Sequence, residues 1–304
     1  MSAASDKSGR LLVLGDVVTD VVANPHGPIA HGTDTSATIQ LRPGGSGANT
    51  ASWAAHCGAS VTMLARAGLD THAWHADELR CHGVDAQLRV DAERATAVVL
   101  ALIADDGERS MITDRGAGAH LSCDDWDDAL LDGTAHVHVS GYTLFSASGR
   151  ALAAAVFDSA EARGVSTSVD PASTSFLLDF GVENFLRETS TVDIVVPNRD
   201  EAMLLSGQRD EAAAARLLSE HYPIAAVTVG ERGAIAAAGG DLLAEAAAPV
   251  RAVTDSVGAG DAFTGAFLAS WMRDKDVSRA LRFGCETAAE AVTVVGGRPP
   301  HRTR

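Results

Sequence analysis

The residues best suited to chemistry lie late in the chain, in the stretch Thr254–Gly265, which reads TDSVGAGDAFTG. Its two glycines, Gly258 and Gly260, open directly into an apolar run with helical spacing. Backbone N–H groups can converge at such a turn, and the start of a helix adds a partial positive charge. We therefore predict that Gly258, Ala259 and Gly260 form an anion hole that holds a transferring phosphoryl group without lysine. A β-branched residue at Gly260 is expected to crowd this hole and to resist any positive φ that the turn requires.

Asp261 follows this turn, at the beginning of the predicted helix. Its carboxylate is placed to take a proton from an acceptor hydroxyl, but a carboxylate that only caps the helix is equally ordinary there. A dinucleotide-binding turn is excluded, because Phe263 stands where the third glycine of Gly-x-Gly-x-x-Gly belongs. The residues of this stretch taken alone leave catalysis and capping both open.

A second glycine cluster, Gly44-Gly45-Ser46-Gly47-Ala48-Asn49, also precedes a predicted helix. Glycines by themselves are typical of any junction between a loop and a helix. Asn49 is more specific, because a side-chain amide in the first turn of a helix can hydrogen-bond the hydroxyls of a polyol.

The composition limits how a phosphate could be bound. Lys7 and Lys275 are the only lysines and neither lies in a glycine-rich stretch, so a Walker-type P-loop is excluded. The net charge of −16 argues against a nucleic-acid partner, and the chain has no apolar run of the ~18 residues that a membrane span needs. Four cysteines without a Cys-x-x-Cys pair are typical of free thiols in a reducing compartment, so we expect a cytoplasmic protein.

The elements that must position these residues alternate along the chain. Short apolar runs predict strands at 11–14, 60–64, 135–139, 166–169, 194–196 and 225–229. Stretches with helical spacing lie between and after them, at 48–56, 73–81, 149–163, 199–206, 211–221, 260–271 and 278–293. This order predicts an α/β fold of three layers, α/β/α, with a mainly parallel sheet. We expect one domain over residues 1–304.

Two segments, about 17–42 and 95–115, break the alternation, because they read as extended chain without an intervening helix. The second contains Asp105-Asp106-Gly107-Glu108, a hairpin-turn sequence between apolar flanks. We predict that both segments form a small β-lid beside the active cleft. An ordinary β-extension without a role in binding is the alternative.

Several motifs, in this order along the chain, together resemble the ribokinase-like (pfkB-type) carbohydrate kinase family. They are Gly15-Asp16, the cluster Gly44–Asn49, Pro197-Asn-Arg-Asp-Glu201, Thr228-Val-Gly-Glu-Arg-Gly233 and Asp255-Ser-Val-Gly-Ala-Gly-Asp261. The resemblance covers about residues 11–297. It implies a ribokinase-like fold and ATP-dependent phosphorylation of a hydroxyl on a small sugar or sugar-like acceptor, with Asp261 as the general base.

The resemblance also implies binding roles for the residues that match these motifs. Asp16, Gly44, Gly45 and Asn49 would bind the hydroxyls of the acceptor, and ATP would lie against Thr228, Gly230 and Gly233. Asn198 and Glu201 would organise Mg²⁺ and its waters, Glu201 through water. Asp255, with backbone carbonyls near Gly296, would form the monovalent-cation (K⁺) site of some relatives. Relatives often dimerise through the lid, so a homodimer is a further expectation.

The sequence departs from the family at two places that bear on the acceptor. Ser46 stands where many relatives carry lysine, and Ser140-Gly141-Tyr142 stands where ribokinase itself carries a glutamate. We therefore expect an unphosphorylated acceptor, and a neutral one before a sugar acid. Arg115, at the end of the second lid segment, is the candidate for holding an acceptor carboxylate, or else it pairs with Asp114 or with a lid neighbour.

Three other functions remain open at this point. The acceptor could be a nucleoside or a keto-deoxy sugar acid, and the scaffold could be a catalytically silent sugar-binding regulator. Such a regulator would normally lack the Asp261 carboxylate or the glycine turn, and this sequence has both. An NAD-dependent oxidoreductase lacks its fingerprint here.

Overall fold

A computed structural model describes residues 9–103 and 109–301 of the chain. Its centre is a sheet of nine strands in the order β13-β12-β11-β10-β9-β8-β1-β4-β5. The strands are parallel except for β12 and β13, which add to one edge as an antiparallel hairpin. In chain order they are β1 (Arg10–Leu14), β4 (Ser60–Gly68), β5 (Val84–Asp91), β8 (Thr134–Ser140), β9 (Ser166–Asp170), β10 (Ile194–Val195), β11 (Ile224–Thr228), β12 (Ala234–Ala238) and β13 (Asp241–Ala246).

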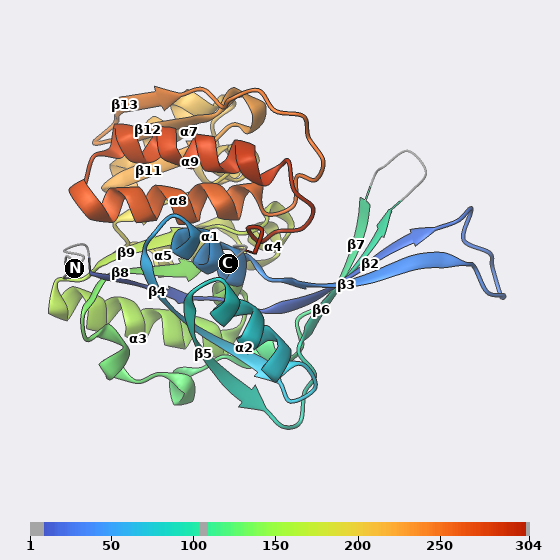
Figure 1. The fold of residues 1–304 in the computed structure, drawn as a ribbon. Helices are drawn as coiled ribbons and strands as arrows, with labels where there is room; N and C mark the ends of the chain where they lie inside the picture. Colours follow the sequence, from blue (N-terminus) through green and yellow to red (C-terminus); the bar gives the residue numbers. More distant parts are fainter. Residues whose placement is uncertain (1–8, 104–108, 302–304) are drawn as a thin grey trace, which may run out of the picture.

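Helices cover both faces of this sheet (Figure 1). One face packs against α3 (Ala147–Arg163), α4 (Thr174–Phe180), α5 (Val182–Glu188), α6 (Arg199–Ser206) and α7 (Glu211–His221). The other packs against α1 (Ser46–His56), α2 (His72–Cys81), α8 (Ala259–Asp274) and α9 (Val277–Ala291). β1 is buried on both sides. Leu12 and Leu14 belong to the hydrophobic core on the side of α3–α7, and Leu11 and Val13 belong to the core on the side of α1, α2, α8 and α9. A continuous apolar strand is what such double burial requires.

The predicted three-layer α/β/α fold is therefore confirmed. The sequence missed the β12–β13 hairpin, because the run Ala234–Ala238 is nearly all alanine and carries no strand periodicity. It also missed β5, although the residues of Val84–Asp91 alternate strictly between apolar and polar, which is the pattern of a half-buried strand.

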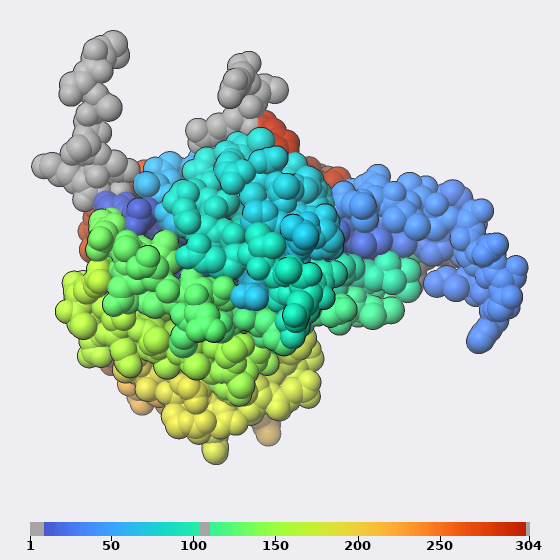
Figure 2. Space-filling view, turned by 90° about the horizontal axis from the view of Figure 1, so that it is seen from below, coloured from blue at the N-terminus to red at the C-terminus, as the bar shows by residue number. Residues whose placement is uncertain are grey.

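A second sheet of four strands, in the order β3-β2-β6-β7, projects from the body (Figures 1 and 2). Its strands are β2 (Val18–Pro25), β3 (Ala37–Gly44), β6 (Ala97–Ile103) and β7 (Arg109–Asp114). We call this sheet the lid. The predicted hairpin turn at 105–108 lies outside the described residues.

The functional site is expected at the carboxyl ends of the parallel strands. In open α/β sheets, ligands bind beyond these ends, where loops lead from strands into helices. Asp16 follows β1, Asp170 ends β9, and Thr228 ends β11. Among the described residues, no helix is both long and apolar enough to cross a membrane.

Candidate active site

Asp261 lies in the first turn of α8 and is held by two side chains from α1. Ser46 Oγ donates a hydrogen bond to Asp261 Oδ1 at 2.7 Å, and Asn49 Nδ2 donates one to Oδ2 at 2.8 Å. Burial raises the pKa of Asp261 to about 7; the two hydrogen bonds oppose the rise, and the nearby charges of Asp170 and Asp16 add to it. A carboxyl with this pKa exchanges its proton near neutral pH, as a general base must.

Asp16 joins β1 to the glycine cluster that begins α1. Its carboxylate accepts hydrogen bonds from the backbone amides of Ser46 at 3.3 Å and Gly47 at 3.1 Å. These amides belong to the start of a helix, where a carboxylate is favoured. Gly45 has a φ of 99°, and a side chain there would collide with the Asp16 backbone. Asp16 therefore positions the loop as well as facing the site.

A cavity of about 490 Å³ lies between this loop and the lid. Five residues predicted to act on the acceptor line it, namely Asp16, Gly45, Asn49, Arg115 and Asp261. The lid contributes an apolar wall on the same side, made by Val18, Val22, Ala97, Val99, Ala101, Ile103 and Met111. Gly44 is not among the described residues that line this cavity; its carbonyl accepts a hydrogen bond from Arg298 Nη2 at 3.2 Å.

Arg115 is directed at Tyr142 rather than at a carboxylate. Its Nη2 donates to the Tyr142 carbonyl at 2.5 Å, and its guanidinium carbon lies 6.0 Å from the centre of the Phe176 ring. The Asp114 carboxylate accepts a hydrogen bond from the Gly116 amide at 2.9 Å. Arg115 lines the cavity and is held there by a neutral partner.

A second cavity, of about 640 Å³, lies on the other side of the Thr254–Asp261 turn. The three residues predicted to contact ATP all line it, Thr228, Gly230 and Gly233. Ala259 and Gly260 line this second cavity, whereas Asp261 lines the first. The beginning of α8 therefore lies between the two cavities.

The two glycines of this turn differ in backbone conformation and in the space around them. Gly258 is the N-cap of α8 with a φ of 77°, and a side chain there would run into Gly297. Gly260 has no positive φ, and a Cβ there would meet no described atom within 4 Å. The positive φ that this turn requires therefore lies at Gly258 and not at Gly260. The space beside Gly260 remains consistent with an anion hole.

Asn198 and Glu201 begin α6 as a reciprocal capping pair. Glu201 N donates to Asn198 Oδ1 at 3.0 Å, and Asn198 N donates to Glu201 Oε2 at 2.9 Å. Burial raises the pKa of Glu201 to about 7, and the charge of Asp170 adds to the rise. A divalent cation relieves such crowding of carboxylates, so these residues fit a magnesium site. Neither residue is among the described ones that line the two cavities.

Asp255 is buried beside the same turn. Its Oδ1 accepts from the Val257 amide and its Oδ2 from the Gly296 amide, both at 3.0 Å. Arg42 Nη1 lies 3.9 Å from Oδ2. A K⁺ ion at Asp255 would have to compete with this guanidinium.

Sequence reasoning missed several charged residues of the site. Asp20 and Arg42 line the first cavity from the lid, and burial raises the pKa of Asp20 to about 6. Arg298 is 7% exposed and comes from the segment after the last helix. Asp170 Oδ2 accepts a hydrogen bond from His138 Nε2 at 3.1 Å, and the charge of Asp170 adds to the raised pKa of Asp261. Of these residues, Asp170 alone could have been found from the sequence, because it directly follows the predicted strand 166–169 and precedes a proline.

The protein is thus a three-layer α/β fold with two cavities, one on each side of the start of α8. The model of the pfkB family carbohydrate kinases matches residues 8–304. The chain belongs to this family, whose members are kinases that act on an alcohol group.

Individual relatives are similar over nearly the whole chain. A ribokinase of Haemophilus influenzae is 28% identical, with 97% of this chain and 95% of that protein covered. A 2-dehydro-3-deoxygluconokinase of Thermoproteus tenax is 30% identical, with 94% and 89% covered. The crystal structure of an adenosine kinase from Sinorhizobium meliloti has the same fold, with a TM-score of 0.86 at 23% identity and 96% of each chain covered.

Proposed function

We propose that this protein transfers the γ-phosphoryl group of ATP to a hydroxyl of an unphosphorylated sugar or sugar-like acceptor, with Asp261 as the general base. The observation that carries the proposal is the position of the α8 start between the two cavities. Ala259 and Gly260 line the second cavity together with Thr228, while Asp261 lines the first cavity together with Asn49. Phosphoryl transfer needs such positioning and charge stabilisation more than covalent chemistry.

In this proposal each side chain of the site has a separate role. Asp261 takes the proton of the attacking hydroxyl, and its raised pKa gives the carboxylate enough basicity to do so near neutral pH. Asn49 and Asp16 orient the acceptor, and the amides of 258–260 receive the transferring group. Asn198, Glu201 and Asp170 would hold Mg²⁺, which neutralises charge on the phosphates when bound.

The charges of the first cavity support an acceptor without a phosphate. Its lining contains the carboxyls of Asp16, Asp20, Asp255 and Asp261. Arg42 and Arg115 are the arginines there, the former beside Asp255 and the latter bonded to a carbonyl. A phosphate dianion would lie among more carboxylates than guanidiniums, which is unfavourable in a desolvated site. A neutral polyol meets hydrogen-bonding groups without that cost.

A keto-deoxy sugar acid is the second candidate acceptor. Arg115 supports it, because one carboxylate could displace the neutral carbonyl of Tyr142 as its partner. The apolar lid wall suits a nucleoside base in the same way, so a nucleoside belongs in the same test.

The test of this function compares the wild type with Asp261→Asn on a panel of acceptors. We expect the amide to keep the shape of the site and to lower kcat by about 10²–10⁴, because it cannot accept the proton. Calorimetry should show ATP and acceptor affinities within a few-fold of wild type. Near-normal turnover would show that Asp261 only caps the helix.

The acceptor panel is ribose, fructose, adenosine, 2-keto-3-deoxygluconate and the fructose 1- and 6-phosphates. A preference for either phosphate would contradict the proposal of an unphosphorylated acceptor.

Two further expectations belong to this proposal. Asp255 is a candidate ligand for an activating K⁺. A comparison of the kinetics in K⁺ with those in Na⁺ would test this activation.

A homodimer through the lid is supported by the exposed apolar residues of its strands, Ile39, Leu41 and Ile112.

A further inference from the structure

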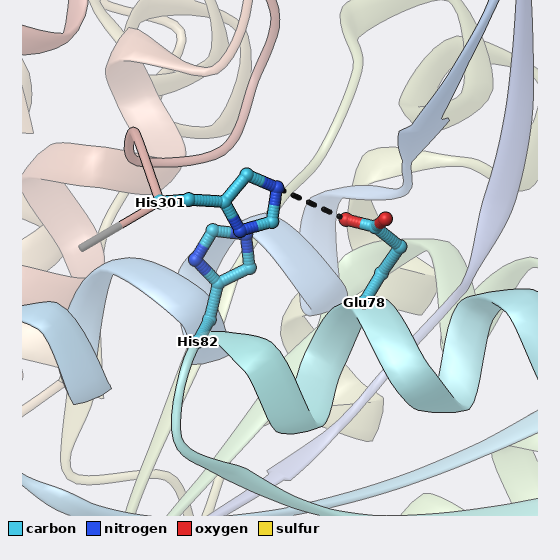
Figure 3. A group of neighbouring side chains, drawn as sticks. All are labelled: Glu78, His82 and His301. Atoms are coloured by element: carbon cyan, nitrogen blue, oxygen red, sulfur yellow. Dashed lines mark ion pairs between the residues drawn. The ribbon is translucent and has the colours of Figure 1, made fainter. Parts of the chain in front are cut away.

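A cluster of three metal-binding side chains lies outside both cavities. Glu78 and His82 project from one face of α2 and its last turn, and His301 comes from the segment that follows α9 (Figure 3). Each residue offers one ligand atom, and these atoms all lie within 4.8 Å of one another. Glu78 Oε2 and His301 Nε2 are 3.6 Å apart, and the two imidazole rings are stacked with centroids 4.8 Å apart.

We propose that Glu78, His82 and His301 bind a transition-metal dication of the Zn²⁺ type, which fastens the C-terminal segment to α2. Two imidazoles and a carboxylate form a ligand set that zinc uses when it keeps a fourth position for water. Tetrahedral bonds of ~2.0–2.1 Å separate ligand atoms by roughly 3.4 Å. The Glu78–His301 pair is already near this spacing. Rotation of His301, which is exposed, completes the geometry.

The character of the ligands selects the metal. Mg²⁺ and Ca²⁺ prefer oxygen ligands throughout, so two imidazoles disfavour them. Arg298, His301 and His56 are the cationic or titratable groups that face His82, and the Glu78 carboxylate faces Arg298 and His301.

The site has a consequence for the acceptor cavity, because the segment that carries His301 also forms part of its wall. Gly297 O accepts from Trp53 Nε1 at 2.9 Å, and Arg298 Nη2 donates to Gly44 O at 3.2 Å. Gly296 lines the cavity and donates to Asp255. A metal that holds His301 against α2 therefore holds this wall against the glycine cluster that begins α1.

The test is calorimetric titration of the full chain with ZnCl₂, without nucleotide or Mg²⁺, together with thermal unfolding in the same solutions. We expect one zinc per chain and a rise in Tm, since a ligand that binds only the folded state stabilises it. Glu78→Gln, His82→Gln and His301→Gln should each weaken zinc binding at least tenfold. His120→Gln, a change at an exposed histidine elsewhere, is the matched control and should bind zinc as the wild type does. Substitution with Co²⁺ should give the strong visible absorption of a tetrahedral site.

Absence of zinc binding in the wild type, or equal binding by wild type and His301→Gln, would overturn the proposal. A cobalt spectrum of octahedral form would do the same. These outcomes are independent of the kinase function, because none of the three residues contacts either cavity and the titration contains no substrate.

Discussion

Asp261 illustrates how neighbouring groups adjust one carboxyl. Burial raises its pKa, and the hydrogen bonds from Asn49 and Ser46 hold the rise to about 7. Both donors stabilise the ionised form, so each one keeps more of the base ready at neutral pH. Ser46 therefore acts directly on the carboxylate that we propose as the base.

This arrangement predicts the pH dependence of the reaction. Because the base must be deprotonated, kcat/KM should fall about tenfold per pH unit below an apparent pKa near 7 and level off above it. Ser46→Ala removes a donor to the carboxylate, so the acid limb should move to higher pH. Ser52→Ala is the control on the same helix, since its hydroxyl bonds only the Ala48 carbonyl. An unchanged limb in Ser46→Ala would show that this hydrogen bond does not tune the base.

We expect substitution of the two glycines in the α8 turn to have different effects, a loss of stability at Gly258 and a loss of activity at Gly260. Gly258→Ala should destabilise the fold, by about 1–3 kcal/mol, because it combines a positive φ with a collision against Gly297. Gly260→Val should stay folded but lose ATP affinity and turnover, because its side chain would fill space in the second cavity. Urea unfolding and steady-state kinetics separate the two, and a fully active Gly260→Val would refute the anion hole.

At the scale of elements, the contact between α1 and α8 builds the site. Gly265 makes it close, since a Cβ there would lie 2.6 Å from Thr50 O and 2.8 Å from Ala54 N. This approach brings Asn49 and Ser46 of one helix within hydrogen-bonding distance of Asp261 on the other. Helix packing, rather than the loops alone, therefore determines the geometry of the base.

Gly265→Ala tests this role of helix packing. The added methyl should push the helices apart, cost about 1–3 kcal/mol of unfolding free energy and lower kcat. Gly239→Ala, at a positive φ with open space around it and far from α8, should cost stability while leaving kcat unchanged. If both variants lose kcat alike, the loss reflects instability and not the helix contact.

For the whole molecule, the lid has two faces with different surroundings. Strand register places Asp20, Arg42 and Val99 on the face toward the cavity. Leu41, Val21, Leu100 and Ile112 form a row across the opposite face, and Leu41 and Ile112 are 64% and 60% exposed. Apolar side chains gathered in this way mark a contact surface.

This outer face predicts the response of the oligomer to mutation. If a second copy covers it, Leu41→Glu or Ile112→Glu should shift sedimentation from dimer to monomer, because a charge would be buried. Leu178→Glu, at an equally exposed leucine on α4, should leave the assembly unchanged. A wild type that sediments as a monomer at micromolar concentration would contradict the expected lid dimer.

Local pattern was enough to predict much of this protein. Apolar runs and helical spacing predicted the layers, because period and propensity depend on near neighbours. The turn before Asp261 was visible for the same reason, as glycines followed by an apolar helix. The family resemblance then supplied the roles, which stay predictions for each residue.

Tertiary structure alone decided which residues meet. Ser46 and Asp261 are separated by 215 positions and bond at 2.7 Å, and Arg298 reaches Gly44 across 254. The positive φ at Gly258 instead of Gly260, and the meeting of His301 with α2, likewise follow from packing. Such contacts depend on how helices and strands pack across the whole core, and no periodicity within a short window of the sequence records that.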